Sequence, residues 1–125
     1  MPSLLALIEI GGYPDFTPIY HEAGYHVEQF TSGRKAISAL KRSPADVVVA
    51  EFNYQLHFRD RTSALESLLA VVQQHPATRT IIFVHPAEEA AFNQLTARFP
   101  VTAVLYHPIT AEALRPLLSP AINPA

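Results

Sequence analysis

The sequence is most informative at first through what it lacks. It contains no cysteine and only four glycines among its 125 residues. The lack of cysteine excludes disulfide bonds and thiolate chemistry, and it gives no indication of an oxidising compartment. No apolar run approaches the ~18 residues that a membrane-spanning helix needs. The first residues also lack the basic and long apolar segments of a secretory signal. We therefore expect a soluble, cytoplasmic protein with no membrane partner.

Charge of either sign is also scarce. Nine basic and eleven acidic residues give a formal net charge of −2, and charged residues make up 16% of the chain. Because nucleic-acid binders present a basic surface, we expect no nucleic-acid partner. The hydrophobic content of 49% supports one core at this length. We expect a single domain over residues 1–118 and a proline-containing tail over residues 119–125.

Several catalytic signatures are absent as well. The chain has no glycine-rich phosphate loop, no nucleophile elbow and no Ser/His/Asp signature. Gly11 and Gly12 follow an apolar run, but two glycines are too few for a dinucleotide-binding fingerprint. We expect no cofactor and no enzymatic activity, although fold alone does not exclude catalysis.

The clearest positive signal is a set of short apolar runs that alternate with segments of helical periodicity. The predicted strands cover residues 3–10, 25–30, 46–51, 80–84 and 101–106. The predicted helices cover residues 15–23, 31–42, 62–75, 87–98 and 110–118. This alternation predicts an α/β fold, with a doubly wound, five-stranded parallel sheet of the flavodoxin type and right-handed crossovers.

Polar residues and one glycine mark the ends of several helices. Asp15, Thr31 or Ser32, and Thr110 stand where a side chain can accept the free backbone N–H groups of a first helical turn. Gly24 fits the position just after the first helix, where a left-handed backbone conformation is common. These residues set the expected boundaries of the helices.

Four segments resemble one known family. Residues 24–27 are Gly-Tyr-His-Val, residues 32–36 are Ser-Gly-Arg-Lys-Ala, residues 43–51 are Ser-Pro-Ala-Asp-Val-Val-Val-Ala-Glu, and residues 104–108 are Val-Leu-Tyr-His-Pro. Over nearly the whole chain this pattern resembles the receiver domain of response regulators. The resemblance implies the strand order 2-1-3-4-5. It also implies a cis peptide bond before Pro108, a geometry that an X-Pro bond tolerates better than other bonds.

The sequence departs from the family pattern at the positions that carry the family's chemistry. Glu51 stands where the resemblance implies a phosphoaccepting Asp at the end of the third strand. The resemblance implies two adjacent acids that hold Mg²⁺ at the end of the first strand. Here the two residues are Glu9 and Ile10, so one of the acids is missing. His85 replaces a Thr or Ser, and His107 replaces the Lys that precedes Pro108. This chain is therefore expected to be an atypical receiver, a pseudo-receiver that is not phosphorylated.

Three interpretations of this degenerate pocket stay open. In the first, Glu51 pairs with a protonated His107. In the second, Glu51 mimics a phosphorylated Asp. Val104 stands where the resemblance implies an aromatic switch residue, so the sequence shows no residue that would respond to such a mimic. In the third, Glu51, His85 and His107 bind a transition metal such as Zn²⁺, whose preferred ligands include imidazole and carboxylate. We expect no metal, because the donors come from different strands.

Two candidate partner surfaces remain. The loop after Glu51 mixes aromatic and Arg residues, which are enriched at interface hot spots, and its best candidates are Tyr54, His57 and Arg59. The resemblance implies a second surface on residues 87–118, which would support a homodimer. We expect a stand-alone, phosphorylation-independent module of two-component signal transduction that acts through protein–protein contacts. The alternative is a small sensor that binds a metal or ligand at the Glu/His edge.

Overall fold

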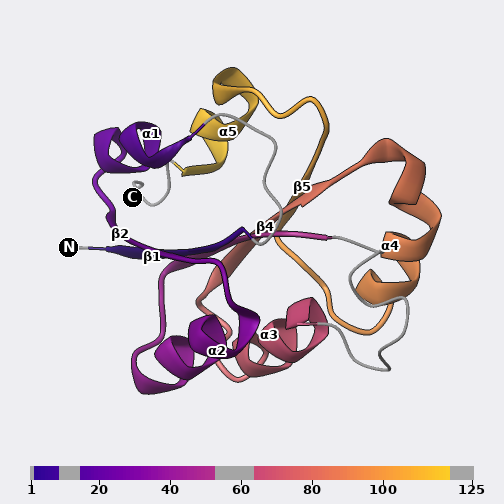
Figure 1. Cartoon of the computed structure of the whole chain (residues 1–125), viewed down its shortest axis with the longest axis horizontal. Helices are drawn as coiled ribbons and strands as arrows, with labels where there is room; N and C mark the ends of the chain where they lie inside the picture. The colour runs from indigo at the N-terminus through magenta and orange to yellow at the C-terminus, as the bar shows by residue number, and fades with distance from the viewer. Residues whose placement is uncertain (1, 9–14, 53–63, 119–125) are drawn as a thin grey trace.

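A parallel sheet runs through the computed structural model, which describes residues 2–8, 15–52 and 64–118 (Figure 1). The strands are β1 (Ser3–Leu7), β2 (His26–Phe30), β3 (Val47–Glu51), β4 (Arg79–Val84) and β5 (Ala103–Tyr106). The helices are α1 (Thr17–Glu22), α2 (Gly33–Arg42), α3 (Ala64–Val72), η2 (Pro86–Glu88, a 3₁₀ turn), α4 (Glu89–Thr96) and α5 (Ala111–Leu118). None of the helices in these ranges is long and apolar enough to cross a membrane.

The five strands lie in the order β2-β1-β3-β4-β5, and all neighbours are parallel, so the predicted fold class and strand order are confirmed. The central strand β3 is buried along its whole length. A parallel strand that is covered on both faces needs no polar alternation, which explains its continuous apolar sequence.

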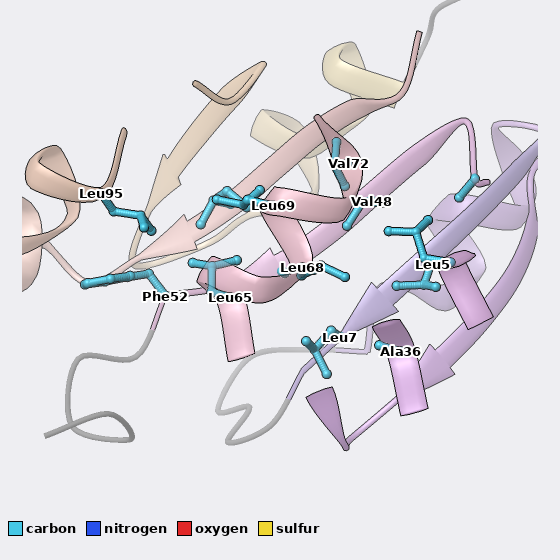
Figure 2. Close-up of a cluster of buried hydrophobic side chains, with 14 of the residues drawn as sticks. Leu5, Leu7, Ala36, Val48, Phe52, Leu65, Leu68, Leu69, Val72 and Leu95 are labelled. Carbon is cyan, nitrogen blue, oxygen red and sulfur yellow. The ribbon is translucent and has the colours of Figure 1, made fainter. Parts of the chain in front are cut away.

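Successive residues of the strands point into two separate cores. Val47 and Val49 pack with α1 and α5, whereas Val48 and Ala50 pack with α2 and α3 on the opposite face. Figure 1 shows these two pairs of helices on either side of the sheet. The predicted apolar stripe of α3 is buried against the sheet, as Figure 2 shows for Leu65, Leu68, Leu69 and Val72.

The start of α4 is tied to the end of β3 by aromatic packing. The rings of Phe52 and Phe92 meet edge to face, with centroids 5.2 Å apart. Both side chains are buried, and Leu95 of α4 joins the same cluster (Figure 2). Phe52 therefore belongs to the core and is no part of an exposed partner loop.

The residues predicted at three helix ends are confirmed. Ser32 caps α2 by accepting the Lys35 N–H, and Thr110 accepts the Ala113 N–H at the start of α5. Gly24 has φ +95°, the left-handed conformation expected after α1. Asp15 does not occupy the predicted cap position of α1, because Phe16 stands there. Asp15 precedes the cap residue by one position, and its carboxylate accepts the Thr17 N–H.

Several predicted boundaries differ from the structure; α3, for example, ends at Val72, three residues before its predicted end. Two of the differences have an identifiable cause. Residues 87–98 form no continuous helix, since Pro86 begins the short turn η2 and α4 follows it as a separate element. Strand β5 begins at Ala103, two residues later than predicted. Immediately before it, Thr80 and Thr102 exchange bonds in which the backbone N–H of each donates to the hydroxyl oxygen of the other, at 2.9 and 3.0 Å. At this point these side-chain bonds take the place of the backbone hydrogen bonds between β4 and β5.

Candidate functional site

The candidate site lies where β3, β4 and β5 end side by side. Glu51 of β3 is paired in register with Phe83 of β4, and Val84 is paired with Tyr106 of β5. His85 and His107 each follow one of these paired residues. Parallel strands place their carboxyl ends at one edge, and ligands of open α/β sheets bind outside that edge.

Glu51 is buried at this edge, with only 6% of its surface exposed. Among the described residues, the other buried side chains that carry a polar group are Thr80, Tyr20 and Tyr25. Burying a carboxylate without a partner is costly, and Glu51 does have an interaction partner in the structure. A pair between Glu51 and His107 stays a prediction.

His85 is exposed, and it caps the turn that follows it. Its Nδ1 accepts the backbone N–H of Ala87 at 3.2 Å. An imidazole nitrogen that accepts a hydrogen bond carries no proton, so the proton of the neutral ring is on Nε2. Pro86 suits the first position of the turn because the N–H that it lacks would have no helical partner. The sequence prediction identified the proline as a boundary but missed the capping role of His85.

His107 is partly buried, and its backbone is fixed by the sheet. Its N–H donates to the carbonyl of Val84 at 3.0 Å, which extends the β4–β5 ladder by one bond. The His107–Pro108 peptide bond is cis, which confirms the geometry that the family resemblance implied.

The two imidazoles lie against each other. The ring centroids of His85 and His107 are 5.5 Å apart, and the ring planes are tilted by 33°. The expectation that these two strand ends converge is therefore confirmed. For Glu51, the structure shows only that its strand, β3, ends at the same edge of the sheet. Nowhere in residues 2–8, 15–52 and 64–118 do three His, Asp or Glu side chains gather closely enough to hold a metal ion. Glu51, His85 and His107 thus do not form a three-ligand site.

Other predicted site residues lie outside the described ranges. Glu9 and Ile10 fall in residues 9–14, and Tyr54, His57 and Arg59 fall in residues 53–63. Their roles in the degenerate pocket and in partner binding stay predictions. Pro108 is described and exposed, next to His107.

The second predicted partner surface consists of α4, β5 and α5. Strand β5 is the edge strand of the sheet, and Ala103, Val104 and Leu105 remain only partly buried. Tyr106 is 39% exposed, and its hydroxyl donates to the Glu89 carboxylate at 3.3 Å. This face thus presents an aromatic side chain that α4 holds in place.

No protein-family model and no curated protein matches the chain. Solved structures do match it over almost its full length. A response regulator from Burkholderia multivorans is 22% identical with a TM-score of 0.74, and the match covers 100% of this chain and 98% of that one. A receiver domain from Clostridium thermocellum is 16% identical with a TM-score of 0.74, covering 98% and 95%. Chemotaxis protein CheY4 from Vibrio cholerae is 22% identical with a TM-score of 0.71, covering 94% and 96%. Together with the sheet order, these likenesses establish that the chain has the fold of a response-regulator receiver domain.

Proposed function

We propose that this chain is a non-catalytic, receiver-like regulatory module of the two-component type that acts through protein contacts without being phosphorylated. One observation carries the proposal: the ends of β4 and β5, where the family resemblance implies a hydroxyl and a Lys, bear the adjoining rings of His85 and His107. The receiver fold supports the regulatory role, and this pair of imidazoles supports the loss of phosphoryl chemistry.

The chemistry of the edge explains why phosphorylation is not expected. Mg²⁺ requires oxygen ligands in nearly octahedral geometry, and Ile10 removes one of the two acids that the resemblance implies. His107 offers a delocalised imidazole in place of the compact ammonium of Lys, and His85 offers no hydroxyl. Glu51 has one more methylene than Asp, so its carboxylate stands further out along the side chain. We therefore expect neither the metal nor the transferred phosphoryl group to be stabilised.

The test is incubation of the protein with acetyl phosphate and Mg²⁺, followed by intact-mass measurement. We expect no mass increase of one phosphoryl group on the wild-type chain. The positive control is a variant in which the pocket is restored to the family pattern by four substitutions: Ile10→Asp, Glu51→Asp, His85→Thr and His107→Lys. A phosphoryl adduct on the wild-type chain that is lost in Glu51→Gln would contradict the proposal.

The partner surface of this module is proposed to be the face formed by α4, β5 and α5, with a second copy of the chain as one partner. Support comes from the partly covered edge strand β5 and from exposed Tyr106. Unpaired backbone groups on an edge strand and exposed aromatic side chains both favour association. Tyr54, His57 and Arg59 are proposed as further partner contacts on the evidence of their sequence alone.

The alternative function, a small sensor that binds a metal or ligand at the Glu/His edge, has one observation in its favour. This is the contact between the two imidazole rings. It does not require the protein-contact role, and the two functions are compatible in one molecule.

A further inference from the structure

We propose that His85 and His107 form a two-imidazole binding site for a transition-metal ion such as Zn²⁺, and that binding of the ion loosens the start of the turn η2. The inference rests on the alternative function, the metal-binding sensor, and does not depend on the protein-contact function. It concerns a site of two residues, without Glu51, because the described residues contain no group of three metal-binding side chains.

The separation of the rings suits a shared ion. Their centroids are 5.5 Å apart. Two imidazoles that bind one Zn²⁺ through nitrogens at about 2.0–2.1 Å place their ring centroids about 5–6 Å apart, depending on the N–Zn–N angle. A change of side-chain torsions that turns one nitrogen of each ring toward the other would bring both within reach of one ion, without movement of the strands. Water would complete its coordination, since His85 is exposed to solvent.

The backbone at both histidines is fixed by hydrogen bonds before any ion binds. The His107 N–H is bonded to the Val84 carbonyl at 3.0 Å, and the His85 carbonyl accepts the Glu88 N–H at 2.8 Å. Each histidine is followed by a proline, Pro86 or Pro108, whose ring fixes the next φ angle. Ligands on a rigid backbone lose little conformational entropy when they bind.

The donor atoms select the kind of ion. Imidazole nitrogen suits Zn²⁺, Cu²⁺ and Ni²⁺, whereas Mg²⁺ prefers oxygen ligands. An edge that resembles the Mg²⁺ site of receivers in position thus differs from it in chemistry. Mg²⁺ is not expected to compete for the two nitrogens.

Binding would be coupled to the beginning of η2 through the tautomer of His85. In the structure, Nδ1 of His85 accepts the Ala87 N–H, so the neutral ring carries its proton on Nε2. An ion bound at Nε2 requires that proton to move to Nδ1, and an ion bound at Nδ1 takes the same lone pair. In either case the Ala87 N–H loses its acceptor. Ala87 is exposed, so water can replace the lost bond.

The experiment is a Zn²⁺ titration of the untagged, chelator-treated chain, followed by calorimetry and by ¹⁵N–¹H NMR spectra. We expect saturable binding of one ion per chain, together with a shift of the Ala87 amide resonance. The variants His85→Asn and His107→Asn should each weaken binding by ~10-fold or more. The matched control is His26→Asn, which removes an exposed histidine from the opposite edge strand β2 and should leave binding unchanged.

Two results would overturn the inference. One is the absence of saturable Zn²⁺ binding to the wild-type chain. The other is binding that persists in both His85→Asn and His107→Asn while their NMR spectra show folded protein. A metal-binding chain whose Ala87 resonance does not move would refute the coupling to η2. None of these results bears on the acetyl phosphate experiment, so the failure of this inference is distinguishable from failure of the proposed function.

Discussion

Tyr20 places a titratable phenol in the core between α1 and the sheet. Its side chain is only 3% exposed and packs in the cluster that contains Leu4, Val49 and Leu114. Burial raises the pKa of the Tyr20 phenol well above its ordinary value, and the negative charge of Asp15 adds to the rise. The folded chain therefore retains a proton that the unfolded chain loses in alkaline solution.

This retained proton predicts how stability depends on pH. An unfolded tyrosine titrates near pH 10, so the contribution of Tyr20 is fully present below that pH and declines as pH rises toward the folded pKa. One such group lowers the free energy of unfolding by up to about 1.4 kcal/mol per pH unit in that window. Tyr20→Phe should therefore show a shallower decline above pH 10 than the wild-type chain. Urea unfolding at a series of alkaline pH values measures this, and parallel curves for the two proteins would refute it.

His85, His107 and Glu51 show how far single residues of the site were predictable. Their common edge followed from the sequence, because parallel strands must end together. The capping bond from Ala87 to His85 did not, since it depends on the torsions of one side chain and of the turn at Pro86. The contact between the two rings has the same origin. Sequence periodicity places a residue on an element, but it does not orient its ring.

The end of α5 is held to the base of the sheet by two side chains. The Arg79 guanidinium donates to the Leu117 carbonyl at 3.0 Å and to the Tyr25 hydroxyl at 2.7 Å. The Tyr25 hydroxyl in turn donates to the Leu118 carbonyl at 3.0 Å. Carbonyls in the last turn of a helix have no partner within the helix, and they form the negative end of its dipole. The Arg79 guanidinium donates a hydrogen bond to one of these carbonyls, and its positive charge interacts favourably with the negative end of the dipole.

Arg79→Ala is therefore expected to release the end of α5 and to lower the free energy of unfolding by about 2–3 kcal/mol, because it removes two hydrogen bonds from a charged donor. Tyr25→Phe keeps the buried ring and removes only the hydroxyl, so a smaller loss of about 1 kcal/mol is expected. Urea denaturation gives both values. An unchanged midpoint for Arg79→Ala would show that these bonds are replaced by water without cost.

The boundaries of the elements were predictable where apolar runs and capping residues agree. Ser32 and Gly24 are examples, because each acts through its own backbone conformation or side-chain oxygen. The late start of β5 was not predictable, since it depends on bonds between Thr80 and Thr102, which lie 22 residues apart. Long-range hydrogen bonds of this kind leave no periodic trace in the sequence.

The strands of the sheet are buried to different extents. Strand β3 is buried on both faces, whereas three of the four residues of β5 are only partly buried and Tyr106 is exposed. Surface salt bridges join Arg98 to Glu66 and Arg115 to Glu22, and in each pair the Arg side chain is more than half exposed. Such pairs contribute little to stability, so the two hydrophobic cores dominate it. The incompletely covered edge strand β5 belongs to the face proposed above for association with a second copy.

The last prediction concerns association through this edge. If the face of α4, β5 and α5 binds a second copy, the mass measured by light scattering should rise with concentration from 13.8 kDa toward twice that value. Tyr106→Glu should suppress the rise, because it places a second carboxylate beside Glu89 and removes the exposed ring. His26→Glu, on the opposite edge strand β2, is the matched control and should leave the rise unchanged. A constant mass of 13.8 kDa at every concentration would exclude the homodimer. An equal effect of both substitutions would place any contact elsewhere, because only Tyr106 belongs to the proposed face.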